Sequence, residues 1–134
     1  MKIRAAGKAD FVKVRALAAS FNLDYEDMED DVFWVAAEGR RIVGTCGLKK
    51  HSDCLELCSL GVAPDFRQRG LGRKLVGALL EATDDEIFLT TIIPGYFEKL
   101  GFEAAHPVPP SLFKAPEWCL GCRPDLCRAL VKRR

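Results

Sequence analysis

Three apolar segments separated by short polar turns constrain the fold most strongly. Residues 32–37 and 41–48 flank a turn at Gly39, and residues 54–62 follow the polar turn at 50–53. Apolar runs rich in β-branched and aromatic residues, bounded by turn residues, are typical of β-strands. Short turns join strands that run antiparallel. The centre of the chain is therefore predicted to be an antiparallel meander.

Helical patterns flank this meander on both sides. Apolar side chains recur at helical spacing after Asp10, a plausible N-cap, and again over residues 71–83. Shorter elements complete the pattern: a strand at Ile3, a strand over 86–91, a short helix over 95–100 and a strand from Phe102. The predicted fold class is α/β (α+β), in the order β-α-βββ-α-β-α-β.

The size and charge of the chain limit its class. Its 134 residues suit one domain with a single core, and 20 basic residues nearly balance 19 acidic ones. This balance gives no reason to expect a nucleic-acid partner. No apolar run reaches the roughly 20 residues of a membrane span, and residues 1–4 lead into polar sequence without a signal-peptide core. We expect one cytoplasmic domain, 1–134, with a Pro- and Cys-rich tail over 107–134 and no membrane partner.

Residues 67–74 place four cations and two glycines at the predicted start of a helix. A helix N-terminus carries about half a positive charge, so cations there are unfavourable unless an anion binds. Unpaired backbone N–H groups, and glycines that admit a ligand close to the main chain, suit a phosphate or pyrophosphate. The spacing differs from the nucleotide P-loop. The segment therefore predicts a phosphate-carrying ligand of another kind.

The residues from Leu60 to Gly72 resemble the central motif of the GNAT superfamily of N-acetyltransferases. The family pattern [Q/R]-x-x-G-x-[G/A] is met by Arg67, Gly70 and Gly72. Residues 97–102 are similar to the second signature, an aromatic-x-x-x-Gly-Phe corner. The resemblance implies the GNAT fold: a central mixed, mostly antiparallel sheet flanked by helices, with a last strand near the C-terminus. It also implies acetyl-CoA as cosubstrate.

The same resemblance implies where acetyl-CoA binds. Main-chain N–H groups from Gln68 to Arg73 would hold the pyrophosphate, and the strand edge at 59–62 would pair with the pantetheine arm. The implied cofactor-binding residues are Ser59, Leu60, Gly61, Val62, Arg67, Gln68, Arg69, Gly70, Leu71, Gly72 and Arg73.

A narrower resemblance involves residues 88–91, Phe97, 101–102 and 108–111, which are similar to the acetyltransferase domain of bacterial N-acetylglutamate synthases. Those enzymes begin arginine biosynthesis by acetylating glutamate, usually with an amino-acid-kinase domain for which this length leaves no room; short stand-alone forms exist. The resemblance implies an acetyl-CoA-dependent N-acetyltransferase acting on a small amino-acid-like amine. Glutamate is the favoured acceptor.

Acetyl transfer needs a deprotonated amine and a proton for the departing thiolate. By the resemblance, Glu56 is the general base and Thr90 protonates or hydrogen-bonds the thiolate. Phe97 stands where the family usually has a tyrosine acid, and the neighbouring Tyr96 is a backup acid. The plainer interpretations are an exposed cross-strand Glu56, a strand-forming Thr90 and a Tyr96 that packs in the core.

The substrate's carboxylates also need cations. Ile92 and Ile93 stand where the synthases often have an arginine, so other basic residues must serve. Arg4 is a distant option, and His51 and His106 are lone histidines without an assigned role. The candidate substrate-binding residues are Lys49, Lys50 and Lys99.

Six cysteines in a chain without an export signal are more consistent with thiols or metal ligands than with disulfides. Cys119, Cys122 and Cys127 form a partial zinc motif. A structural zinc needs four ligands. The fourth would come from Cys46, Cys54, Cys58 or His106. A redox-active or disulfide pair, and reduced thiols in a packed tail, are the alternatives.

Two rival functions stay open. One is a GNAT enzyme that acetylates a protein N-terminus or lysine, with an acidic groove supplied by residues 22–31. The other is a non-catalytic acetyl-CoA- or metal-binding module. The favoured partner is a small-molecule amine, and the resemblance is compatible with a homodimer.

Overall fold

The structure is a computed structural model that describes residues 1–112 and 127–134. Cys119 and Cys122, two of the predicted zinc ligands, lie outside the described residues. The chain divides into two compact units, each considered by itself below. Unit 1 comprises Met1–Lys49 and Leu57–Asp84, and unit 2 comprises Lys50–Glu56 and Asp85–Arg134.

The elements follow the order expected from the sequence. They are β1 (Lys2–Ala5), α1 (Phe11–Ala19), β2 (Val32–Glu38), β3 (Arg41–Lys50), β4 (Leu55–Val62), α2 (Leu71–Glu81), β5 (Ile87–Thr91), α3 (Pro94–Glu98), β6 (Glu103–Ala104) and β7 (Arg128–Lys132). The strand order is β1-β2-β3-β4-β5-β7-β6. The β4–β5 pair is parallel, whereas β1–β2, β2–β3, β5–β7 and β6–β7 are antiparallel. The predicted mixed, mostly antiparallel sheet and its last strand are confirmed.

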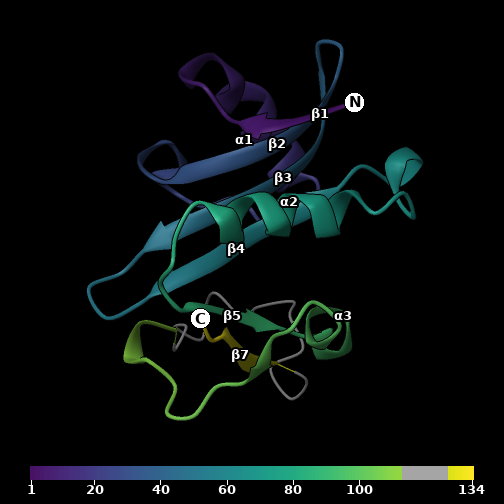
Figure 1. Cartoon of the computed structure of the whole chain (residues 1–134). Coiled ribbons are helices and arrows are strands. Elements are labelled where there is room, and N and C mark those ends of the chain that lie inside the picture. Colours follow the sequence, from purple (N-terminus) through teal and green to yellow (C-terminus); the bar gives the residue numbers. More distant parts are fainter. Residues whose placement is uncertain (113–126) are drawn as a thin grey trace. The chain divides into compact units, whose positions relative to one another are not determined.

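Unit 1 packs a helix on each face of its strands. Successive side chains of a strand point to opposite faces. Phe33 and Val35 of β2 join the core cluster that contains Val14 and Ala18 of α1. The other face of the strands meets α2, which crosses in front of them in Figure 1. Of the apolar positions that suggested this helix, Leu71, Leu75 and Leu79 are buried, together with Val76. Ala82, which was expected on the same face, follows the end of α2 and is exposed.

Gly47 on β3 lies where the core of unit 1 leaves no room for a side chain. A Cβ at Gly47 would lie 2.7 Å from the ring of Phe33 and 3.0 Å from Sγ of Cys58. Phe33 is 1% exposed and its ring also meets Phe11 at 5.6 Å, so it has little room to move. We therefore expect Gly47→Ala to lower the free energy of unfolding by about 1–3 kcal/mol.

The matched control is Gly77→Ala in α2, where nothing lies within 4 Å of the added Cβ. Alanine is the better helix former, so this variant should gain about 0.5–1 kcal/mol. Urea denaturation of both variants measures the difference. Equal unfolding midpoints for Gly47→Ala and wild type would contradict the close packing of Phe33.

Unit 2 is built around β5, β7 and α3. Phe97 of α3 and Phe102 are both buried, with ring centroids 5.8 Å apart in an edge-on arrangement. The Phe102 N–H donates to the Phe97 carbonyl at 3.1 Å, which closes the corner between α3 and β6. The second signature is therefore a packed helix-to-strand corner. It returns the chain from α3 to the sheet, where β6 pairs with β7.

Asp10 differs from the prediction in its role. It is the residue before α1, but its side chain does not cap that helix. Its carboxylate accepts from the Gly7 N–H at 2.7 Å and from both terminal nitrogens of Arg4, at 2.7 and 3.1 Å. These donors, Arg4 first, lower the pKa of Asp10 from 3.8 to about 2. Arg4 is thus engaged in an ion pair within unit 1.

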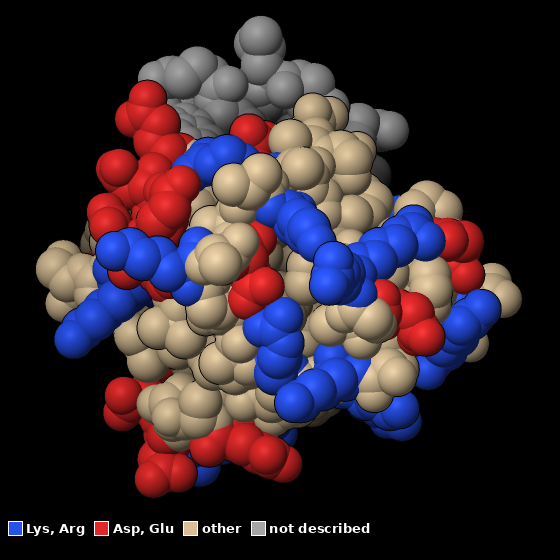
Figure 2. All heavy atoms as spheres, turned by 90° about the horizontal axis from the view of Figure 1, so that it is seen from above, with Lys and Arg blue, Asp and Glu red and all other residues tan. Residues whose placement is uncertain are grey.

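Two features of the described residues concern the surface and the helices. Basic and acidic side chains are interspersed over the face shown in Figure 2. Among the described residues no helix has both the length and the hydrophobicity to cross a bilayer.

Candidate active site

The helix start predicted to hold a phosphate lies in unit 1, between β4 and α2. Gln68 and Gly70 adopt left-handed backbone conformations, with φ of 64° and 74°. Residues 67–70 are exposed. Within the described residues no side chain caps Gly70, the N-cap residue of α2. The first N–H groups of α2 can therefore reach an anion from solvent.

The cations around this helix start are held by contacts within unit 1. Arg67 donates from Nε to the Val62 carbonyl at 3.0 Å, and its guanidinium lies 5.5 Å from the Phe21 ring centroid. The Arg69 guanidinium lies 4.7 Å from the ring of Phe66. These contacts keep positive charge beside the uncapped helix start, as an anion site requires.

The strand that precedes this loop contains an irregularity that the sequence did not indicate. Ser59 of β4 has a φ of 51°, a conformation that costs a non-glycine residue about 1–3 kcal/mol. Two hydrogen bonds hold it: Ser59 Oγ donates to the Leu23 carbonyl at 2.7 Å, and Thr45 Oγ1 donates to the Ser59 carbonyl at 2.8 Å. The implied pantetheine edge, 59–62, thus begins at a fixed distortion of the strand.

Glu56 lies in unit 2, at the start of β4. Its side chain is buried, with a residue exposure of 4%, so the interpretation as an exposed cross-strand residue is wrong. The carboxylate Oε1 lies 2.7 Å from Nε2 of His51, whose side chain is 18% exposed. A buried carboxylate is costly unless it is hydrogen-bonded, and the imidazole supplies such a partner.

Sequence reasoning assigned no role to His51. The signal available was its position in the turn before β4, five residues from Glu56. Two side chains five residues apart meet only when the turn between them folds back on itself. The sequence does not reveal this turn geometry, so it did not predict the contact.

Thr90 shares a sheet face with Glu56. In the parallel pairing of β4 with β5, Glu56 lies opposite Phe88. Paired residues of neighbouring strands point to the same face, and so do residues two apart on one strand. Glu56 and Thr90 therefore project from the same face, with Cα atoms about 8 Å apart by strand geometry. The sheet therefore presents the two residues predicted to handle protons on one face.

Tyr96 of α3 is 40% exposed, with its ring 5.0 Å from that of Phe97. Tyr96 therefore packs against the buried Phe97 without being buried itself, and its role as a reserve acid stays a prediction.

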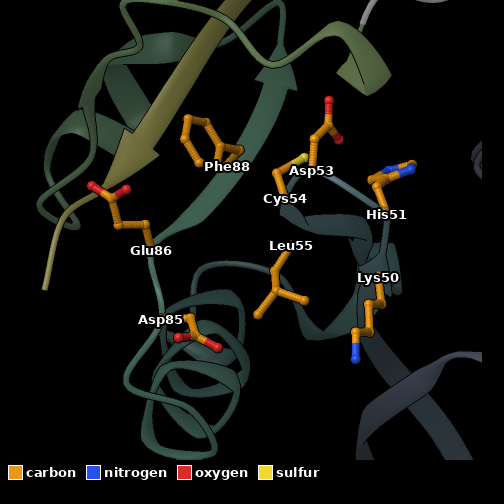
Figure 3. A pocket seen from close by; sticks show the side chains of 8 residues that line it. All are labelled: Lys50, His51, Asp53, Cys54, Leu55, Asp85, Glu86 and Phe88. Atoms are coloured by element: carbon orange, nitrogen blue, oxygen red, sulfur yellow. The ribbon is translucent and has the colours of Figure 1, made fainter.

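The three candidate lysines occupy different surroundings. Lys49 of unit 1 places Nζ 4.3 Å from the ring centroid of Tyr25. Lys99 directly follows α3 and is exposed. Lys50 lines a shallow cavity of about 310 Å³ in unit 2, shown in Figure 3. The lining side chains are Lys50, His51, Asp53, Cys54, Leu55, Asp85, Glu86 and Phe88.

The described cysteines, Cys46, Cys54, Cys58 and Cys127, form no disulfide with one another. Burial raises the pKa of the Cys46 thiol, as expected for a core residue. Burial, with the nearby charge of Asp53, raises the pKa of Cys54 to about 11. The part of the chain that the structure describes contains no cluster of three or more His, Cys, Asp or Glu residues suited to a metal. The zinc site at Cys119, Cys122 and Cys127 stays a prediction.

Comparison with solved structures gives the same fold. The N-acetylglutamate synthase of Neisseria gonorrhoeae, complexed with coenzyme A and N-acetyl-glutamate, superposes with a TM-score of 0.78 at 21% identity, covering 98% of this chain and 34% of that one. Rv2747 of Mycobacterium tuberculosis, in complex with CoA, gives 0.74 at 20% identity, covering 100% and 99%. Arabidopsis thaliana Naa50, with a bisubstrate analogue, gives 0.69 at 20%, covering 100% of both. The fold is that of the acyl-CoA N-acyltransferases.

Sequence comparison defines the family. Residues 7–102 match the profile of the Acetyltransferase (GNAT) family. The uncharacterized N-acetyltransferase CT2212 of Chlorobaculum tepidum is 33% identical over 76 residues, which cover 53% of this chain and about half, 49%, of that protein. The chain belongs to the GNAT family of acetyltransferases.

Proposed function

We propose that this chain is an N-acetyltransferase that moves an acetyl group from acetyl-CoA to the amine of a small amino-acid-like acceptor, with glutamate favoured. The observation that carries the proposal is the pair of functional features that β4 and the loop after it contain. A buried carboxylate, Glu56, lies near the start of this strand, and an uncapped, cation-flanked helix start follows its end.

The helix start fits the diphosphate of acetyl-CoA. The N–H groups of Leu71, Gly72 and Arg73 belong to the first turn of α2, where no intrahelical acceptor exists for them. Arg67 and Arg69 add positive charge beside the same exposed loop. When bound there, acetyl-CoA supplies an acetyl thioester already activated for transfer.

Glu56 and Thr90 then handle the protons. An amino acid at neutral pH carries an ammonium group, which must lose a proton before its nitrogen can attack. The Glu56 carboxylate accepts that proton, directly or through a water molecule. The Thr90 hydroxyl, on the same sheet face, donates a hydrogen bond to the departing sulfur, and Tyr96 is the reserve donor. The acetyl group passes directly between the two substrates.

Two observations favour a small acceptor. The chain is similar to the synthase complexed with N-acetyl-glutamate, although it spans about a third, 34%, of that protein. The acidic segment at residues 22–31, which would bind a basic peptide, already makes contacts within the chain. Arg15 forms an ion pair with Glu29, the Tyr25 hydroxyl donates a hydrogen bond to Asp31, and Met28 is fully buried. Lys50 is a candidate anchor for an acceptor carboxylate. On this proposal the enzyme acts in the cytoplasm, in amino-acid and arginine biosynthesis.

A thiol-release assay tests the function. The protein is supplied with acetyl-CoA and each amino acid in turn, and free CoA is measured; a parallel series uses peptides with free N-termini or lysines. We expect release with glutamate or a close relative. Calorimetric binding of acetyl-CoA without release for any amino acid would overturn the small-acceptor proposal, and release with peptides alone would favour protein acetylation.

A further inference from the structure

We propose that His51 is a positioning residue for acetyl transfer, which acts by holding the Glu56 carboxylate in the orientation that accepts the proton. This inference rests on the proposed function, because it assigns His51 to the base of that reaction. Its direct evidence is the 2.7 Å contact between His51 Nε2 and Glu56 Oε1.

Both residues stand on backbone that is itself fixed. The His51 N–H donates to the Cys54 carbonyl at 2.9 Å and closes the turn between β3 and β4. Glu56 is paired with Phe88 across the β4–β5 ladder. Because the backbone on both sides is already ordered, only the two side chains lose conformational freedom when the hydrogen bond forms. The pair is therefore suited to hold the carboxylate before an acceptor arrives, which is what a catalytic base needs.

The chemistry of the pair fixes the role of each atom. The carboxylate oxygen is an acceptor, so Nε2 of His51 carries the hydrogen and donates it. In the reaction the N–H bond of the acceptor ammonium breaks and an O–H bond forms on Glu56. The electron pair left on nitrogen attacks the thioester carbonyl. His51 keeps its hydrogen throughout, so it orients the base without exchanging a proton.

Other groups around the pair are less suited to this role. Burial and Asp53 keep Cys54 a neutral thiol, which is a weak donor. Asp53 accepts from the Ser111 N–H at 3.2 Å, and Glu86 is paired with Arg133. The remaining charged side chains at the cavity of Figure 3 are Lys50 and Asp85. His51 is the cavity-lining residue whose ring nitrogen lies at hydrogen-bond distance, 2.7 Å, from Oε1 of Glu56.

The test compares His51→Gln with His51→Leu. The glutamine amide nitrogen reaches a place similar to Nε2 and can donate to the carboxylate, whereas leucine fills the space without a donor. We expect His51→Leu to lower kcat by about 10–100-fold, the cost of a misplaced catalytic group. The KM for acetyl-CoA should not change, and His51→Gln should retain most of the activity. Thermal unfolding and calorimetric acetyl-CoA binding establish that each variant is folded.

A double-mutant cycle with Glu56→Gln separates positioning from mere stability. If His51 acts through Glu56, His51→Leu should have little further effect on kcat in the Glu56→Gln background. The rates are measured with whichever amine the wild type acetylates, amino acid or peptide. Unchanged kcat in Glu56→Gln means that the proposed base is wrong. If Glu56→Gln lowers kcat but His51→Leu keeps the wild-type kcat, the role of His51 is wrong while Glu56 stays the base. The same conclusion follows if His51→Leu and His51→Gln lower kcat equally.

Discussion

Replacement of Glu56 by glutamine is expected to lower kcat by at least about 100-fold, within the range that positioned general bases contribute. Glutamine has nearly the same size and can still hydrogen-bond to His51, but its amide does not accept a proton at neutral pH. The proposed acetyl-CoA contacts lie over residues 59–73, so the dissociation constant for acetyl-CoA should stay at the wild-type value. Initial rates of thiol release and calorimetry measure the two quantities.

Glu103→Gln is the matched control for this experiment. Glu103 of β6 is an exposed glutamate of unit 2 whose Oε1 lies 3.2 Å from Nε of Arg133. The same chemical change there should leave kcat at the wild-type value. If Glu56→Gln also turns over at the wild-type rate, the assignment of the base is wrong even though the family is established.

Replacement of Gly70 by aspartate is expected to weaken acetyl-CoA binding by at least about 100-fold while the protein stays folded. Gly70 is the N-cap of α2, with a φ of 74° that aspartate tolerates better than most residues. Because residue 70 is left-handed and not in the extended conformation that side-chain capping needs, the added charge is the main difference at the helix start. This charge would repel the diphosphate by about 4 kcal/mol at 4 Å for an effective dielectric constant of 20, more than the roughly 2.8 kcal/mol that a 100-fold loss requires.

The control is Gly70→Asn, which has nearly the same shape and a similar tolerance of positive φ but carries no charge. It should weaken binding less than aspartate does, and both variants should lose a similar free energy of unfolding, about 1–2 kcal/mol, because both place a side chain at positive φ. Calorimetry with acetyl-CoA and urea denaturation give the two readouts. Wild-type affinity in Gly70→Asp would show that the diphosphate does not bind at the start of α2.

The strand and helix order was predictable because each element carries its own local signal. The apolar runs of β2 and β3, the helical spacing of Leu71, Leu75 and Leu79, and the aromatic corner at Phe97 are all visible within a few residues of sequence. The glycines and arginines of residues 67–74 are likewise adjacent in the sequence, so the helix start was predictable from them. The structure confirms that this helix start is exposed and has no side-chain cap.

The features that the sequence did not indicate depend on contacts between distant or reoriented residues. Glu56 stands between Leu55 and Leu57, an alternation that suggests one exposed face. The turn before β4 instead places His51 against its carboxylate, and Glu56 is buried. The left-handed Ser59 needs Leu23 and Thr45 to hold it. Asp10 binds Arg4 and the Gly7 N–H instead of its own helix. Local patterns do not contain these partners.

The most direct test of the central proposal is to identify the acetylated product. The protein is incubated with isotopically labelled acetyl-CoA and an equimolar mixture of the amino acids, and the products are analysed by mass spectrometry. Labelled N-acetylglutamate as the main product, absent from Glu56→Gln, is the expected result. Consumption of acetyl-CoA with a supplied peptide while every amino acid stays unmodified would contradict it.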